Sequence, residues 1–490
     1  MELSESNKAA LKQRGISESD LTHQLELIAR GTNFIKLLRP CSVGDGIIRM
    51  SNTKLNDAIA AFDAESANYD LAKFVPASGA ATRMFKRIYT WVNEPKKNEA
   101  DINRFFRDIE KFPLFEEWVL CADRCDIETF ESGLDSKIAW LKLLLEEEGL
   151  GYALKPKGLI PFHLYGETTR TPLVEHLVEA TRYASQDNVC KLHFTISEQH
   201  LDGFEAELEI AKELGELKSY DFQVSFSFQE AKTDTVAANV SNEPFTLNGD
   251  LVMRPGGHGA LIHNLNNLDS DLVFVKNIDN VCHQERIETT VRYKKALAGK
   301  LFELRADLHL LDKHLKKGLL DEREIQKLRD KWQIRIPKSY RVLQAFLKRP
   351  IRVCGMVLNE GEPGGGPFWV KDQILGESIQ ILEQSQIDLS DSSQSLTLKH
   401  ASHFNPVDIV CCLKDLEGNK IDLLQYIDSE QFFIAQKTVE GQSIKALEWP
   451  GLWNGAMANW ITLFVEVPVS TFNPVKEFKD LLRPAHSAKK

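Results

Sequence analysis

Several features that would fix the class of this protein at once are missing from its sequence. No apolar run approaches the roughly 20 residues needed to span a bilayer, and the N-terminus lacks the apolar core of a signal peptide. The chain carries a net charge of -11, which argues against a general affinity for nucleic acid. These absences predict a cytoplasmic protein with no membrane partner and no nucleic-acid partner.

Paired cysteines are also missing. The eight cysteines are scattered along the chain, and no C-x-x-C pair occurs among them, so the sequence indicates neither a zinc site nor a disulfide framework. The rest of the composition, 43% apolar and 27% charged residues, is typical of a globular protein. With 490 residues the chain is long enough for roughly two to four domains.

What the sequence does contain is a strand, loop and helix signal over Phe74–Arg87. An apolar run ends at Pro76, small residues follow, and Thr82 and Arg83 begin a helical pattern. Small residues allow backbone N–H groups to approach a phosphate closely, and the N-terminus of a helix adds its own positive end. An ordinary strand-to-helix turn also favours small residues, so this stretch alone leaves both interpretations open.

Strands and helices are predicted to alternate along much of the chain. Apolar runs favour strands at 71–75, 191–197, 222–228, 272–275, 351–357, 407–413 and 460–467, and helical periodicity favours helices at 54–64, 88–150, 171–180, 201–214 and 285–347. This spacing predicts an α/β fold with a mixed, mostly parallel sheet and helical insertions. The expected parts are a helical segment at 1–70, an α/β domain at 71–290 with a helical insertion at 88–150, a second insertion at 291–350, and a C-terminal section at 351–490.

Two charged residues are candidates for contact with a phosphate or a metal ion. Lys157 follows Pro156 in a loop, where a lysine is suited to meet a phosphate as a point charge; a solvated surface lysine is the alternative. Asp279 follows a buried strand, and ligands of open α/β sheets bind outside the carboxyl ends of strands. A carboxylate beside a triphosphate is a candidate Mg²⁺ ligand, whereas an Asx-turn would use Asp279 only for local structure.

Two glycine-rich loops follow later in the chain. The loop RPGGHG at 254–259 would allow main chain to lie against a flat ring, or would simply permit a turn. The loop EGEPGGGPFW at 360–369 offers acceptors and an aromatic ring for a polyhydroxylated ligand, with an ordinary surface loop as the alternative.

Five segments, taken in chain order, resemble the motifs of the nucleotide-sugar pyrophosphorylases, which are nucleotidyltransferases with a glycosyltransferase-A-like α/β fold. They are FVPASGAATRM at 74–84, PKGLIP at 156–161 with TPLVEH at 171–176, PGGHG at 255–259, FVKNIDN at 274–280, and EVP with FNPVKEFKDLL within 466–482. The branch that these segments resemble most is that of the UDP-glucose and UDP-N-acetylhexosamine pyrophosphorylases. The whole chain also resembles a bacterial family known only as a domain of unknown function (4301).

The resemblance implies a reaction in which a sugar-1-phosphate attacks the α-phosphate of a nucleoside triphosphate and pyrophosphate leaves. It implies uracil as the base, Mg²⁺ as the cofactor, nucleotide binding by 71–290, sugar binding by 351–490, and a monomer or homodimer. The implied catalytic residues are Arg83, Lys157 and Lys476, and the implied metal ligand is Asp279. The implied nucleotide-binding residues are Ala77, Ser78, Gly79, Ala80, Ala81, Thr82, Gln229, Gly257, His258 and Gly259. The implied sugar-phosphate-binding residues are Asn277, Glu362, Gly364 and Asn473.

The sequence also departs from the motifs that it resembles. Ala77, Ser78, Ala80 and Ala81 stand where the family usually has more glycine, and side-chain groups at these points could crowd a phosphate. This departure favours a second hypothesis, a non-catalytic nucleotide-sugar-binding or sensor protein. A third hypothesis, a glycosyltransferase, would require an Asp-x-Asp metal motif, and the corresponding strand end reads Asn277-Ile278-Asp279.

Overall fold

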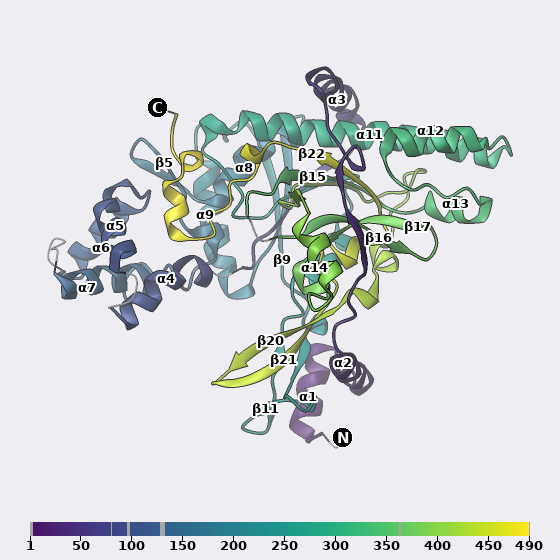
Figure 1. Cartoon of the computed structure of the whole chain (residues 1–490). Coiled ribbons are helices and arrows are strands. Elements are labelled where there is room, and N and C mark those ends of the chain that lie inside the picture. The colour runs from purple at the N-terminus through teal and green to yellow at the C-terminus, as the bar shows by residue number, and fades with distance from the viewer. Residues whose placement is uncertain (1–2, 80, 96–98, 128–132, 362–363, 490) are drawn as a thin grey trace. The chain divides into compact units, whose positions relative to one another are not determined.

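The structure, a computed structural model, describes residues 3–79, 81–95, 99–127, 133–361 and 364–489 (Figure 1). The chain divides into two compact units, each built from three separate segments. The first unit comprises Met1–Asp70, Gln229–Val275 and Lys294–Val469, and the second comprises Leu71–Phe228, Lys276–Tyr293 and Ser470–Lys490. The domain boundaries expected from the sequence stay a prediction.

The first unit holds most of the strands. Its helices are α1 (Glu5–Arg14), α2 (Glu18–Arg30), α3 (Asn52–Glu65), α10 (Leu261–Asn267), α12 (Glu322–Trp332), α13 (Tyr340–Phe346), α14 (Ser392–Lys399) and the part of α11 (Glu288–Lys316) from Lys294 onward. Its strands are β1 (Leu37–Pro40), β2 (Ser42–Val43), β3 (Gly46–Ile48), β10 (Thr235–Ala238), β11 (Thr246–Leu247), β12 (Asp250–Leu251), β13 (Met253–Arg254), β14 (Leu272–Val275), β15 (Ile351–Leu358), β16 (Gly366–Asp372), β17 (Gly376–Leu382), β18 (His403–Phe404), β19 (Ile409–Cys412), β20 (Phe433–Val439), β21 (Gln442–Glu448) and β22 (Ile461–Glu466).

The strands of the first unit form several sheets. A mixed sheet has the order β2-β3-β22-β15-β19-β14, in which the pairs from β2 to β15 are parallel and the last two pairs are antiparallel. An antiparallel sheet β13-β10-β21-β20 is covered by α2, whose buried face includes Leu21 and Ile28. Another antiparallel sheet has the order β1-β16-β17.

The long helix α11 carries the leucine stripe that the sequence shows. Leu301, Leu304, Leu308 and Leu311 recur at helical spacing, and all four are fully buried. Burial of such a stripe is the main source of helix stability in a folded protein. None of the helices in the described ranges is both long and apolar enough to cross a membrane.

The second unit is smaller. Its helices are α4 (Thr82–Asn93), α5 (Glu99–Arg107), α6 (Phe115–Arg124), α7 (Leu134–Leu145), α8 (Pro172–Tyr183) and α9 (Leu201–Lys212), and its strands are β4 (Leu71–Pro76), β5 (His163–Tyr165), β6 (Thr168–Arg170), β7 (Ser185–Gln186), β8 (Val189–Thr195) and β9 (Asp221–Ser227). The pairs β4–β8 and β8–β9 are parallel. The carboxyl ends of these three strands therefore lie at one edge of the sheet.

Helices α4 to α7 share one hydrophobic core with the C-terminal segment of the chain. Met84 and Phe85 of α4, Trp118 of α6, and Val475 and Phe478 of the C-terminal segment are all buried in this core. Figure 1 shows the four helices as one blue group. The helical region predicted at 88–150 is therefore present, and its packing fixes the position of residues 475–478.

The α/β class with a mixed, largely parallel sheet is confirmed. The strands expected near 71–75, 191–197, 222–228 and 351–357 are β4, β8, β9 and β15, with small differences at their ends. The finer expectation of a glycosyltransferase-A-like fold stays a prediction.

Candidate functional site

The stretch after β4 is the loop that the sequence singles out. The Ala77 N–H donates to the Thr195 carbonyl at 2.8 Å, and the Ala81 N–H donates to the Lys155 carbonyl at 3.3 Å. Ala77 and Ala81 are fully buried, and Ala81 belongs to the helical core. Their methyl groups therefore fill core positions, which is a packing reason for alanine in place of glycine. Ala80 lies outside the described residues.

The exposed residues of this stretch are small, polar or basic. Ser78, Gly79, Thr82 and Arg83 are exposed. No side chain caps the N-terminus of α4, and the Arg83 guanidinium has no ion-pair or hydrogen-bond partner among the residues that the structure describes. An uncapped helix N-terminus with an adjacent arginine is a suitable environment for phosphate.

Lys157 connects two of the other segments directly. Its ammonium group lies 2.6 Å from the Asp279 carboxylate and 2.7 Å from the Val475 carbonyl oxygen, and it donates to both. The side chains of Lys157 and Asp279 are 13% and 19% exposed, so the ion pair is largely shielded from water. Residues from three distant parts of the chain thus meet at one lysine.

Further hydrogen bonds hold the strand end against the C-terminal segment. The Val475 N–H donates to the Asp279 carbonyl at 3.2 Å, and the Asn473 N–H donates to the side-chain oxygen of Asn280 at 2.8 Å. Asn277 accepts the Asn280 N–H through its carbonyl at 3.1 Å. The predicted residues Asn277, Asp279 and Asn473 are therefore gathered in one place.

Lys476 and Arg83 are carried by elements that pack on each other. Phe85 of α4 and Phe478 lie with their ring centres 5.2 Å apart, and Arg87 forms an ion pair with Glu477 at 3.3 Å. The ammonium group of Lys476 lies over the Phe472 ring at 5.4 Å. Packing of α4 on residues 475–478 therefore brings together the two elements that bear the outermost predicted cations.

Residues 276–278 run beside β4. The Lys276 N–H donates to the Phe74 carbonyl at 3.2 Å, and the Ile278 N–H donates to the Pro76 carbonyl at 3.3 Å. Asp279 thus follows a segment that ends at the same edge as β4, where the loop at 77–82 begins. This is the edge at which α/β sheets bind ligands.

A buried charged cluster connects β4, α8 and Lys276. Glu179 of α8 accepts from Lys276 at 2.6 Å and from Lys73 at 2.9 Å, and all three side chains are buried. Burial alone would raise the pKa of Glu179, but the charges of Lys276 and Lys73 outweigh it and hold this pKa well below its ordinary value. Glu179 is therefore ionised, and it accepts from both lysines.

Lys73 and Glu179 are not among the site residues predicted from the sequence. The signal that could have found them is a lysine inside the apolar strand at 71–75 and a glutamate inside the apolar helix at 171–180. Charged residues in such positions are rarely buried unless they are paired. His176 was also missed: burial, assisted by the charge of Lys73, holds its pKa well below the ordinary value, and its neutral ring donates to the Ile278 carbonyl at 3.1 Å.

The described residues at this edge offer few ligands for a divalent cation. Within the described residues, no three His, Cys, Asp or Glu side chains are grouped as a metal site. Mg²⁺ in nucleotide sites is held by one or two carboxylates, with phosphate oxygens and water completing its shell. The partly exposed Asp279 carboxylate can supply the one carboxylate of this arrangement, with water or phosphate oxygens completing the shell.

The other predicted nucleotide-binding residues lie in the first unit, where they contact their own chain. His258 stacks on Trp453 with ring centres 4.3 Å apart and accepts the Leu452 N–H at 3.0 Å. A Cβ at Gly259 would lie 2.3 Å from the Pro450 carbonyl oxygen. Gln229 donates to Thr233 at 3.2 Å. The role of these residues, together with Gly257, in reading a base stays a prediction.

The remaining sugar-phosphate candidates also belong to the first unit. Gly364 is exposed, just before β16, and Glu362 lies outside the described residues. Their role in binding a sugar phosphate stays a prediction.

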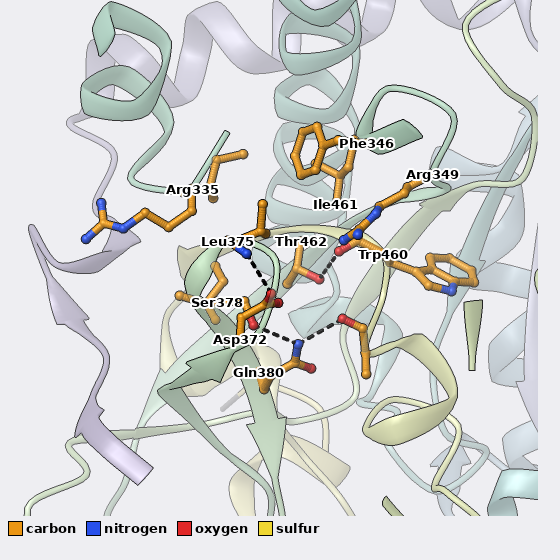
Figure 2. A pocket seen from close by; sticks show the side chains of 13 residues that line it. Arg335, Phe346, Arg349, Asp372, Leu375, Ser378, Gln380, Trp460, Ile461 and Thr462 are labelled. Carbon is orange, nitrogen blue, oxygen red and sulfur yellow. Dashed lines mark hydrogen bonds between the residues drawn. The ribbon is translucent and has the colours of Figure 1, made fainter. Parts of the chain in front are cut away.

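A pocket of the first unit, shown in Figure 2, is lined by residues of α13, β17 and β22. Its inner volume is about 30 Å³, which holds a water-sized group but no nucleotide. Its polar groups bind their own chain: Gln380 donates to the Ala458 carbonyl at 2.8 Å, and Asp372 accepts the Leu375 N–H at 2.8 Å. None of the described site candidates lines this pocket.

The fold and the gathered residues define an α/β protein with a basic site around one carboxylate at the carboxyl end of parallel strands. The sequence matches the family described as "Domain of unknown function (DUF4301)" over residues 4–487, and the chain belongs to that family. The membership expected from the sequence is thereby confirmed. A comparison with curated proteins finds no match.

The chain is also similar to solved structures of pyrophosphorylases. The UDP-N-acetylglucosamine pyrophosphorylase of Trypanosoma brucei, solved with an inhibitor, shares 13% identity, with 98% of this chain and 79% of that chain covered and a TM-score of 0.49. The UDP-glucose pyrophosphorylase of Leishmania major shares 13% identity at the same coverage, with a TM-score of 0.44. A Trypanosoma brucei UDP-glucose phosphorylase shares 14% identity, with 97% and 77% covered and a TM-score of 0.44.

Proposed function

We propose that this protein is a nucleotidyltransferase of the nucleotide-sugar pyrophosphorylase type with a glycosyltransferase-A-like fold. It joins a nucleoside triphosphate, UTP by analogy with the motifs, to a sugar-1-phosphate and releases pyrophosphate. The observation that carries the proposal is the contact of Lys157 with both Asp279 and Val475. This contact unites three of the resembling segments in the second unit, and the Ala81–Lys155 hydrogen bond attaches the fourth.

The proposed reaction needs no nucleophile from the protein. A phosphate oxygen of the sugar-1-phosphate forms a bond to the α-phosphorus of the triphosphate, and the bond from that phosphorus to the pyrophosphate oxygen breaks. The protein contributes positioning and neutralisation of charge. Mg²⁺, held by Asp279 and by phosphate oxygens, supplies additional positive charge when it is bound.

The residues of the second unit take separate roles in this proposal. The exposed backbone at Ser78 and Gly79, the first turn of α4, and Arg83 hold the triphosphate. Lys157 and Lys476 neutralise negative charge on the phosphates, Lys476 on the side of the sugar phosphate.

The test is pyrophosphate release by the purified protein with a panel of nucleoside triphosphates and sugar-1-phosphates, with and without Mg²⁺. One substrate pair should give turnover that depends on Mg²⁺. In that assay Lys476→Ala should lower the rate about a hundredfold, whereas Lys479→Ala, an exposed lysine of the same segment, should leave it unchanged. Absence of pyrophosphate with every pair would reject the proposed reaction.

A non-catalytic nucleotide-sugar-binding protein is the second candidate. The observation in its favour is that Lys157 and Asp279 bind each other and so satisfy two groups that the reaction would use. Such a protein would be stabilised against heat by a nucleotide sugar through mass action, and it would release no pyrophosphate from any substrate pair.

A further inference from the structure

The ammonium group of Lys157 lies on the carboxylate that the proposed function assigns to the metal ion. It contacts the Asp279 carboxylate at 2.6 Å and the Val475 carbonyl at 2.7 Å, which uses two of its three N–H groups. A carboxylate and a carbonyl are both hard oxygen donors of the kind that divalent cations choose. The lysine ammonium group therefore binds two oxygen atoms that could also bind a metal ion.

The local structure keeps the lysine in this place. Lys157 begins the short 3-10 turn Lys157–Leu159, directly after Pro156. The ring of Pro156 fixes the φ angle of that residue and so restricts the backbone that leads to Lys157. The pair is largely buried, so removal of either charge would leave the other without a partner in a poorly solvated site. The carboxylate and the lysine thus neutralise each other while no ligand is bound.

We propose that Lys157 and a divalent cation compete for the Asp279 carboxylate, so that metal binding releases Lys157 to the phosphates. The inference rests on the proposed function, in which Asp279 holds the metal and Lys157 meets phosphate. Lys157 then occupies the Asp279 carboxylate in the resting protein and contacts phosphate in the loaded one. The Val475–Asp279 and Asn473–Asn280 hydrogen bonds do not involve Lys157 and keep the C-terminal segment in place during the exchange.

The first experiment measures Mn²⁺ binding to the full chain without nucleotide, by the electron paramagnetic resonance signal of free Mn²⁺. Lys157→Met should bind Mn²⁺ about tenfold more tightly than the wild type, because a bound cation no longer competes. Lys157→Arg keeps the charge and should bind like the wild type. Lys155→Met is the matched control, since the Lys155 ammonium lies over the Tyr152 ring and forms no ion pair within the described residues. Asp279→Asn should lose the site.

An unchanged or weaker affinity of Lys157→Met for Mn²⁺, with its melting temperature preserved, would overturn the inference. The same holds if neither the wild type nor Lys157→Met binds Mn²⁺ in a manner that Asp279→Asn abolishes. If the wild type shows no turnover with any substrate pair while Lys157→Met still gains Mn²⁺ affinity, the inference stands and the proposed reaction fails. Turnover by the wild type without a gain of Mn²⁺ affinity in Lys157→Met would support the reaction and reject the competition.

A second experiment tests the released lysine and does not depend on the stability of Lys157→Met alone. It measures binding of inorganic pyrophosphate by calorimetry in the presence of a chelator. Asp279→Asn should bind pyrophosphate about tenfold more tightly than the wild type, because Lys157 is freed. The double variant K157M/D279N should lose this gain. Retention of the gain in the double variant would mean that Asp279 merely repels the anion, which contradicts the exchange.

Discussion

Two loops of this protein are rich in small residues, and they are built in opposite ways. The loop at 77–82 in the second unit exposes Ser78 and Gly79, and a Cβ at Gly79 would meet no described atom within 4 Å. The loop at 256–259 in the first unit is packed on its own chain. A Cβ at Gly256 would lie 2.3 Å from the Trp449 ring, and one at Gly259 would lie 2.3 Å from the Pro450 carbonyl oxygen.

The difference shows that small residues serve two purposes which the sequence does not separate. At 256–259 they allow two stretches of main chain to approach closely, as the Trp449 N–H bond to the Gly256 carbonyl at 3.1 Å illustrates. At 78–79 they leave backbone accessible beside an uncapped helix and an exposed arginine. The second arrangement is the one that can approach a phosphate.

The largest expected effect concerns activity at the open loop. Arg83→Ala should lower pyrophosphate release by about a hundredfold to a thousandfold, since it removes a positive charge from the proposed triphosphate site. The melting temperature should hardly change, because the side chain is exposed. Steady-state rates with the active substrate pair measure the effect.

The control for this variant is Arg104→Ala, an exposed arginine of α5 in the same unit. It should retain the wild-type rate. Full activity of Arg83→Ala would remove the distinction between the two loops, because the open loop would then have no role in binding phosphate.

The next largest effect concerns stability and compares one glycine from each loop. Gly259→Ala should lower the free energy of unfolding by about 3 kcal/mol, because its Cβ would overlap the Pro450 backbone and the chain must shift. Gly79→Ala should change it by less than about 0.5 kcal/mol, because the new methyl group enters open space. Urea denaturation of both variants measures the difference, and equal losses would show that the two loops are packed alike.

Much of the second unit could be predicted from the sequence. Apolar periodicity located β4, α4, α8, β8, α9 and β9, since it depends only on residues near each other in the chain. The family resemblance placed Lys157 and Asp279 in one site although they are 122 residues apart. Periodicity alone could not have done so, because it carries no information on contacts between distant segments.

What the sequence could not provide is the environment of each loop. Phe478 completes the core of the helical insertion from the far end of the chain, and Trp449 and Pro450 occupy the space beside 256–259. Both depend on tertiary packing between segments that no local pattern links. Glycine spacing was therefore compatible with a base-binding loop and with a self-packed loop alike.

The smallest expected effect uses pH to probe the strand that anchors the open loop. Ala77 is held by the Thr195 carbonyl of β8, and β8 also carries the buried His193, whose ring nitrogens lie 2.7 Å from the Ser225 and Ser227 hydroxyls. Burial lowers the pKa of His193 to about 4. The unfolded chain therefore binds the proton first as the pH falls, so this contribution to stability is present above about pH 6.5 and is lost toward pH 4.

Between pH 7 and pH 5 this titration should cost about 2 kcal/mol of unfolding free energy. His193→Gln cannot titrate in this range but keeps groups that can bind the two serines, so it should lose about 2 kcal/mol less than the wild type over the same interval. Acid effects from other groups are common to both proteins and cancel in the difference. Urea denaturation at the two pH values measures it. An equal loss in both proteins would show that His193 is not held neutral, and that the strand beneath the open loop is no more sensitive to acid than the rest of the chain.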